Sequence, residues 1–334
     1  MIVWIQFSVC LILIAVAGYK LALYGDIIGE KLKLSRSWVG IVMVASVTSL
    51  PELVTGVSSV TVAQAPDIAV GDVLGSCIFN LLLIVILDFL HRRESVYSTA
   101  KIGHTLSAGF GIILIGFVGM NLLLAQSGMD FSIAHVGLYT PMILIMYALA
   151  MRTLFRYEQM QELPVADVAH PRYQKTTVKQ AVAGYGMASV VVIAAGVWLP
   201  FVGKALAVQM GWSEGFVGTI FIAAVTSLPE AAVTIAAVRL GALDMALGNL
   251  FGSNLFNIAI LAIDDLFYLQ GPILSEVSTA HAVSAMSAIL MTGIAIVGLF
   301  YRPQQRLFKT VGWTSLFLLL VYLFNTFVVY SYEN

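Results

Sequence analysis

The sequence predicts an all-α polytopic membrane protein whose ten transmembrane helices form two inverted five-helix repeats. The first observation is composition, since 60% of the 334 residues are hydrophobic and only 10% are charged, unlike a soluble domain. The second is a succession of apolar stretches long enough to span a bilayer. The third is a motif, Val-Thr-Ser-Leu-Pro-Glu, that occurs at residues 47–52 and again at 225–230. A glutamate beside a helix-breaking proline at membrane depth is costly, which indicates a functional site.

The spans are assigned by length, because a transmembrane helix needs about 20 mostly apolar residues. They are expected at 3–23, 38–62, 67–90, 103–124, 133–153, 178–207, 215–238, 244–267, 279–301 and 310–331. The first lacks a cationic start and a clear cleavage site, so we expect a retained span and not a signal peptide. The polar segment between the fifth and sixth spans is too short for a folded domain. We therefore expect a first repeat at 1–154, a cytoplasmic linker at 155–177 and a second repeat at 178–334.

The basic residues predict the orientation. If the N-terminus lies outside, every lysine and arginine except Lys204 faces the cytoplasm, as the positive-inside tendency requires. Both termini are then outside. Because each half has an odd number of spans, the second half enters the membrane from the opposite face, so the repeats are inverted.

The repeat is also visible in the spacing of polar residues. The offset is 178 for Glu52 and Glu230 (230−52), and it is 177 for Asn80 and Asn257 (257−80). One residue is therefore missing from the turn between the paired helices of the second half. Two inverted units place both motifs near the bilayer midplane, where secondary transporters hold their substrates.

Each motif predicts a broken helix lined with oxygen atoms. Pro51 and Pro229 lack a backbone donor, so the carbonyls around 45–47 and 223–225 should lose helical partners. Ser49 could also cap the helix that restarts after the break. The motif oxygens are the hydroxyls of Thr48, Ser49, Thr226 and Ser227 and the carboxylates of Glu52 and Glu230. Oxygen ligands without histidine or thiolate suit sodium or calcium and argue against zinc or copper.

A second polar row is expected on the spans that follow the breaks. Its members are spaced by four and share one helical face: Asp72, Ser76 and Asn80 in the first half, and Asn249, Ser253 and Asn257 in the second. Neighbouring glycines would let these helices approach the broken spans closely. The four segments together could surround a cation.

Structural alternatives exist for single features. A proline can simply kink a membrane helix, and spaced glycines can simply pack helices. Two inverted copies that both carry glutamate disfavour this explanation, because an unpaired membrane carboxylate is costly. For Asp67 and Asp244 we expect helix N-capping, and for Asp88, Asp264 and Asp265 an interfacial position. A pH-sensing histidine stays open.

These residues resemble the cation/calcium exchanger superfamily, and within it the prokaryotic sodium/calcium antiporters. The likeness covers the whole chain and rests on two family elements, Gly-Thr-Ser-x-Pro-Glu followed by Gly-Asn-x-x-Gly-Ser-Asn-x-x-Asn or Asp, whose counterparts occur in both halves at matched spacing. The resemblance implies a prokaryotic inner membrane and a gate formed by the first and sixth spans. It implies that Glu52 and Glu230 bind both ions, and that the sites are completed by Thr48, Ser49, Thr226, Ser227, Ser76, Ser253, Asn80, Asn257 and the carbonyls of Ala45 and Ala223.

The chain departs from the family pattern at three points. Val47 and Val225 replace the glycine before Thr-Ser, and Asn257 stands where many relatives carry aspartate. Asp72 stands where the family has asparagine. Asp72 could replace the missing charge or bind a proton, or it could line an access path as a partner of backbone or serine groups.

The sequence thus predicts a secondary active antiporter that exchanges Ca²⁺ for Na⁺ by alternating access at a shared midplane site. An H⁺/Ca²⁺ exchanger of the same fold is the alternative. An enzyme is disfavoured, because the midplane offers no histidine, arginine or lysine beside the two glutamates. A channel would show calcium flux independent of a counter-ion. We expect no cofactor, no nucleic acid and no obligate protein partner, with the lipid bilayer as surroundings.

Overall fold

The computed structural model describes residues 1–31, 45–90, 95–101, 103–129, 131–161, 176–239, 241–303, 306–307 and 311–333. The α-helices are α1 (Ile2–Lys31), α3 (Leu50–Ser58), α4 (Pro66–Leu90), α5 (Val96–Thr99), α6 (His104–Gln126), α7 (Tyr139–Gln161), α8 (Val178–Met210), α9 (Glu214–Phe216), α10 (Ala223–Thr226), α11 (Leu228–Arg239), α12 (Leu243–Phe267), α13 (Ala280–Tyr301) and α14 (Trp313–Glu333). Three shorter helical segments are the π-helices η1 (Ser59–Ala63) and η2 (Val217–Ile222) and the 3₁₀-helix η3 (Ile273–Ser275).

Two small hairpins are the only strands in the described part of the chain. Strand β1 (Ser132–Ile133) pairs antiparallel with β2 (Val136–Gly137), and β3 (Arg306–Leu307) pairs antiparallel with β4 (Val311–Gly312). Each hairpin directly precedes a long helix, α7 or α14.

Seven of the described helices are long and apolar enough to cross a membrane, namely α1, α4, α6, α8, α12, α13 and α14. An eighth span is the pair Glu214–Thr226 and Leu228–Arg239, bent by 45° at its break. The chain is therefore an integral membrane protein. The expected span at 38–62 is described only from residue 45, where it includes a shorter apolar helix, Leu50–Ala63.

The fifth expected span differs from its prediction. Residues 132–137 form the first hairpin, so the helix begins at Tyr139 and not at 133, and it continues to Gln161 inside the expected linker. Helix α7 carries several polar residues, so it is not among the helices that are long and apolar enough to cross a membrane. Residues 162–175 of the linker lie outside the described part.

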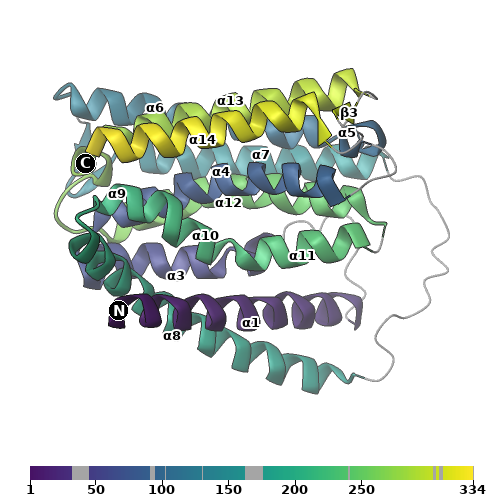
Figure 1. Ribbon diagram of the computed structural model, residues 1–334, viewed down its shortest axis with the longest axis horizontal. Helices are drawn as coiled ribbons and strands as arrows, with labels where there is room; N and C mark the ends of the chain where they lie inside the picture. The colour runs from purple at the N-terminus through teal and green to yellow at the C-terminus, as the bar shows by residue number, and fades with distance from the viewer. Residues whose placement is uncertain are drawn as a thin grey trace.

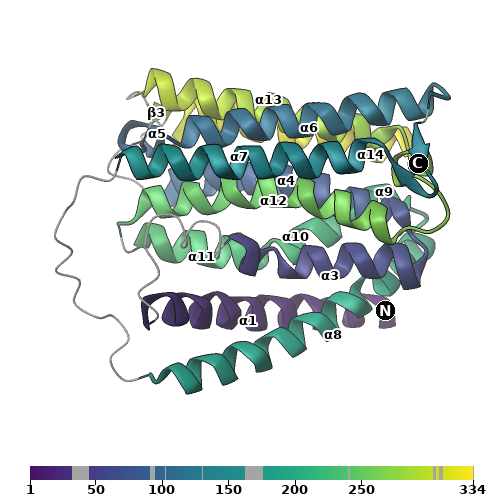
Figure 2. The same cartoon turned by 180° about the vertical axis from the view of Figure 1, so that it is seen from behind.

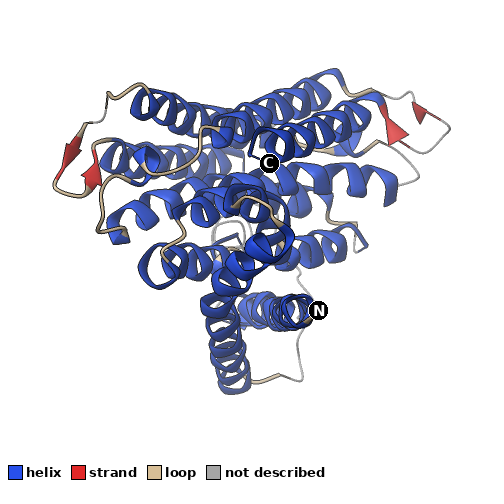
Figure 3. Ribbon diagram, turned by 60° about the vertical axis from the view of Figure 1, so that its left-hand side comes forward, coloured by secondary structure: helices blue, strands red, loops and turns tan. Residues whose placement is uncertain are grey.

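The helices lie in layers with α4 and α12 in the middle (Figures 1 and 2). Helices α6, α7, α13 and α14 lie on one side of this pair, and the broken spans lie on the other. One large apolar core joins α4 and α12 to the first side. Helices α1 and α8 pack along each other and project from the body as a pair (Figure 3), held by a smaller cluster that includes Ile14 and Leu199.

Close approach of α4 to η2 depends on glycine. A Cβ atom at Gly75 would clash with the backbone oxygen of Thr219 and would lie 2.8 Å from the Cβ of Ala223. Gly75 thus lets α4 press its polar face directly against the second broken span, as the sequence predicts for the glycines of this row.

Asp88 and Asp265, 177 residues apart (265−88), anchor the two hairpins. Asp88 accepts hydrogen bonds from the Gly312 amide at 2.8 Å and from Ser315 Oγ at 2.9 Å. Asp265 accepts from the Gly137 amide at 3.0 Å and from Tyr139 Oη at 2.7 Å. Both aspartates are fully buried. Each therefore ties a hairpin to the end of a central helix, and the interfacial depth expected for them stays a prediction.

A second matched pair lies at the starts of α4 and α12. Asp67 Oδ1 lies 3.0 Å from His281 Nε2, and Asp244 Oδ1 lies 3.1 Å from His104 Nε2. The aspartates and the histidines are each 177 apart (244−67 and 281−104). The expected N-capping role is replaced by contacts that join these helix starts to α13 and α6.

Candidate functional site

Each motif breaks its helix at the serine. Residues 45–48 are helical, Ser49 is in a turn, and α3 begins at Leu50 with Pro51 in its first turn. The second motif repeats this arrangement, with Ser227 in the turn between α10 and α11. Proline tolerates the first turn of a helix, because its missing amide would have no partner there. The break is therefore encoded by Ser-Leu-Pro in both halves.

One prediction for this break is wrong. The carbonyls of Ala45 and Ala223 were expected to lose their helical partners, but they accept the amides of Ser49 and Ser227 at 3.0 and 3.1 Å. The Ala45 carbonyl also accepts the Thr48 hydroxyl at 3.1 Å, and the Thr226 hydroxyl oxygen lies 3.3 Å from the Ala223 carbonyl.

Ser49 does not cap its own helix; its side chain reaches the other motif instead. Ser49 Oγ donates to Glu230 Oε1 at 2.9 Å, and Ser227 Oγ donates to Glu52 Oε1 at 3.2 Å. All four side chains are fully buried. The two breaks thus face each other, as the inverted spacing predicts, and they exchange equivalent hydrogen bonds that the sequence does not predict.

One oxygen of each glutamate remains unbonded. Neither Glu52 Oε2 nor Glu230 Oε2 accepts a hydrogen bond from the described residues. The basic side chains of Lys204, His104 and His281 contact carboxylates outside this site, namely Glu214, Asp244 and Asp67. Two buried carboxylate oxygens without donors are the atoms that a cation would satisfy.

The second row joins the site partly as predicted. Ser253 Oγ donates to Glu230 Oε1 at 3.3 Å. Thr226 Oγ1 donates to Asp72 Oδ1 at 2.8 Å, and Ser76 Oγ donates to the same oxygen at 3.4 Å. Asp72 is fully buried, and its Oδ2 accepts no hydrogen bond from the described residues. Asp72 therefore bonds across the halves to the second motif.

The two terminal asparagines are buried near the crossing of α4 and α12. Asn80 Nδ2 donates to Asn254 Oδ1 at 3.0 Å, and Asn254 Nδ2 donates to the Cys77 carbonyl at 3.1 Å. Asn257 is fully buried too. Sequence reasoning missed Asn254, although its offset of 177 from Cys77 (254−77) marks the point where the halves meet.

Asn249 has a different environment from Asp72, its counterpart. Its Nδ2 donates to Thr234 Oγ1 on α11 at 3.3 Å. The two rows thus differ at their first members and also at their serines, since Ser76 donates to Asp72 and Ser253 donates to Glu230.

The donor set fits a hard cation with oxygen ligands. Two glutamates could balance one Ca²⁺, with hydroxyl and amide oxygens as neutral ligands. In the described ranges no three histidine, cysteine, aspartate or glutamate side chains converge as a metal-holding group. A bound ion would therefore depend on the glutamate pair together with the neutral oxygens of the motifs and rows.

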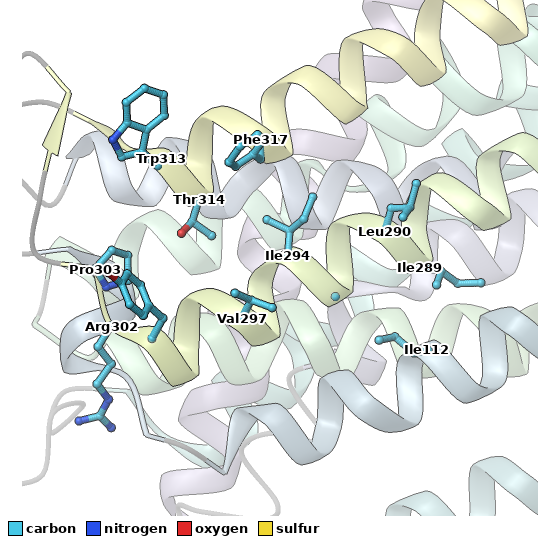
Figure 4. Close-up of a pocket in the computed structure, with 12 residues that line it drawn as sticks. Ile112, Ile289, Leu290, Ile294, Val297, Arg302, Pro303, Trp313, Thr314 and Phe317 are labelled. Carbon is cyan, nitrogen blue, oxygen red and sulfur yellow. The ribbon is translucent and has the colours of Figure 1, made fainter.

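A hollow of about 1040 Å³ lies elsewhere, between α13 and α14 (Figure 4). Apolar residues such as Ile294, Val297 and Phe317 line it, and Arg302 lies at one end. It contains no acidic side chain among its lining residues. Its chemistry suits apolar groups and not a hard cation.

Comparison with known proteins gives consistent matches. The family model described as sodium/calcium exchanger protein matches residues 2–157 and 180–331. The inner membrane protein YrbG of Escherichia coli is 30% identical over 252 residues, which cover 75% of each chain. A structure of the sodium-calcium exchanger NCX_Mj soaked with Na⁺ and Ca²⁺ has 20% identity and a TM-score of 0.62 over 97% of each chain. The H⁺/Ca²⁺ exchanger CAX has 12% identity and a TM-score of 0.72 over 99% of this chain and 85% of its own.

Proposed function

The chain belongs to the sodium/calcium exchanger protein family, and from that premise we propose that it is a secondary antiporter that exchanges Ca²⁺ for Na⁺. The observation that carries this proposal is the pair of reciprocal Ser-Glu bonds, which leave one oxygen free on Glu52 and one on Glu230. The two carboxylates neutralise one Ca²⁺. Na⁺ ions that occupy the same oxygens displace it, so both ions compete for one site.

The proposed ligands include those expected from the sequence. Besides the two glutamates, we propose as oxygen ligands the side chains of Thr48, Ser49, Thr226, Ser227, Ser76, Ser253, Asp72, Asn80 and Asn257. The carbonyls of Ala45 and Ala223 already accept amide hydrogen bonds. They also lie within hydrogen-bond distance of the Thr48 and Thr226 hydroxyls. Because a carbonyl oxygen has two lone pairs, each could contribute to a cation once its threonine hydroxyl turns away.

We further propose ten spans in two inverted halves, 1–154 and 178–334, joined by a linker at 155–177. The matched offsets support this arrangement. So do two pairs of aspartates whose members make equivalent contacts in the two halves: Asp88 and Asp265 each bind a hairpin, and Asp67 and Asp244 each contact a histidine. The family model also matches one segment in each half. The basic residues favour both termini outside, in the inner membrane of a prokaryote.

Helices α1 and α8 are the proposed gate. They pack along each other outside the main core, and α1 crosses the second break where Gly18 lies against the ring of Pro229. A side chain at Gly18 would clash with that ring. Sliding of this pair past the breaks would expose the glutamates to each face in turn.

The test is Na⁺-driven ⁴⁵Ca uptake into proteoliposomes. Wild type should accumulate calcium against a gradient when sodium is loaded inside, and Glu52→Gln or Glu230→Gln should not. Glu214→Gln is the matched control, because Glu214 lies outside the site and is 3.8 Å from Lys204. Robust uptake in both central variants, or uptake without any counter-ion gradient, would contradict the proposal.

Proton coupling is a second candidate, favoured by Asp72. This buried carboxylate has one unbonded oxygen next to the second motif, where a proton could travel with each transport cycle. Uptake driven by a pH gradient in sodium-free vesicles would support it. Uptake that needs sodium at every pH would rule it out.

A further inference from the structure

Asp264, near the end of α12, is a buried carboxylate that the central site does not use. It is fully buried, and neither of its oxygens accepts a hydrogen bond from the described residues. The next residue, Asp265, accepts the amides of Gly137 and Ile273 at 3.0 and 2.8 Å. The segments that pack on the end of α12 therefore supply donors to Asp265 and, among the described residues, none to Asp264.

The Asp264 side chain lies against α3 beyond the central site. A Cβ atom at Gly56 would approach Asp264 Oδ1 to 2.7 Å, so the missing side chain of Gly56 makes room for the carboxylate. Gly56 follows Glu52 by four residues on the same helical face, about 6 Å farther along the axis. Asp264 follows Asn257 by two turns on α12.

This position is on the approach from one particular face. Helix α12 runs toward the end of the molecule where both chain termini lie (Figures 1 and 2). We call this end the terminal face. Asp264 thus lies between the central glutamates and the terminal face.

The counterpart positions on the opposite side carry no carboxylate. The three positions of the first approach and their counterparts, at offsets of 177 or 178, are Asp264 and Leu87, Gly56 and Thr234, and Asp72 and Asn249. On the opposite side, Asn249 donates to Thr234 and Leu87 is buried. At these positions the first approach therefore carries two carboxylates and the opposite one none, and Asp88, next to Leu87, already has donors at both oxygens.

Asp72 is a second buried carboxylate next to the centre, since it accepts the Thr226 hydroxyl of the second motif. Carboxylates that repel one another in a low-dielectric interior are stabilised by a cation between them. The ion pairs of the described residues supply no lysine or arginine for Asp264.

We propose that Asp264 holds a hard cation, Ca²⁺ or Na⁺, on its way between the terminal face and the central glutamates. This inference rests on the proposed antiporter function. Asp264 is the ligand of an approach site, with Asp72 on its central side. Loss of the approach site should weaken uptake of cations presented at the terminal face and should leave release toward the opposite face unchanged.

The experiment compares right-side-out and everted membrane vesicles, with Asp264→Asn as the main variant. We expect the half-saturating Ca²⁺ concentration to rise about 3- to 10-fold at the terminal face and to stay within about 2-fold at the other. Asp264→Glu should retain most of the affinity. Glu214→Gln should behave as wild type, because its carboxylate is already paired with Lys204.

Gly56→Ala is the second variant, in case Asp264→Asn does not accumulate. Its methyl group would press on the carboxylate, so the same one-sided loss is expected. The same curves measured for Na⁺ identify the ion, and a one-sided shift for either ion supports the inference. Unchanged or equally shifted values at both faces would overturn it, as would a change confined to pH dependence. Absence of exchange in wild type would instead overturn the proposed function.

Discussion

Two groups of buried carboxylates differ in how completely they are hydrogen-bonded. At the centre, each glutamate keeps one oxygen that receives no donor from the described part of the chain. At the helix ends, Asp88 and Asp265 receive backbone amides and hydroxyls at both oxygens. All are fully buried, so burial alone does not distinguish them. A saturated carboxylate stabilises the fold, whereas a half-bonded one keeps a place for a cation.

The largest expected effect is the loss of transport in Glu52→Gln. Removing a charged ligand should lower calcium exchange at least about 100-fold. The midpoint of thermal unfolding should stay the same or rise, because an uncompensated buried charge is also removed. Uptake and unfolding are measured on the same preparation, with Glu214→Gln as control. A large fall in the midpoint would show that Glu52 stabilises the fold as Asp88 and Asp265 do, which would contradict the difference between the two groups.

Asp265→Asn should show the opposite pattern. It places an amide group among donors and should lower the free energy of unfolding by about 3 kcal/mol. Asp264→Asn is the matched control one residue away, and it should not lower stability. Thermal unfolding in detergent tests both. Equal losses of stability in the two variants would mean that the number of hydrogen-bond donors does not distinguish structural carboxylates from ion-binding ones.

Ser49→Ala and Ser227→Ala test the reciprocal bonds. Each leaves one glutamate with fewer donors, and we expect about a 10-fold rise in half-saturating Ca²⁺. The two variants should agree within a few-fold, because their bonds are equivalent. Ser8→Ala, which removes an exposed hydroxyl bonded to its own helix, should have no effect. An effect in only one of the two variants would show that the halves bind unequally.

Asp72→Asn should give the smallest change, because Asp72 combines features of both groups. One of its oxygens accepts two hydroxyls and the other accepts none from the described residues. We expect less than about a 10-fold loss of sodium-driven uptake, together with loss of any uptake driven by a pH gradient. Transport is measured under each gradient separately. An unchanged profile under both gradients would leave Asp72 a structural partner of Thr226.

The centre of the site could be predicted from the sequence because the inverted repeat relates the two motifs in space. Two motifs at one offset, in halves of odd span number, imply that Glu52 and Glu230 face each other. Serine-to-glutamate pairing across the halves was not predicted, because a local pattern favours capping of the serine's own helix. Asp265 and Asp264 could not be separated either. Adjacent residues look equivalent in sequence, and only the hairpin and Gly56 give them different surroundings.

Helices α1 and α8 are longer than the bilayer is thick, so the lipid affects their movement. With 30 and 33 residues, these helices extend for about 45 and 50 Å, against a hydrocarbon thickness of about 30 Å. They must tilt or extend into the headgroup layer, and any sliding changes that mismatch. The exchange rate should therefore depend on acyl-chain length. The surrounding bilayer then sets part of the energy barrier that each transport cycle crosses.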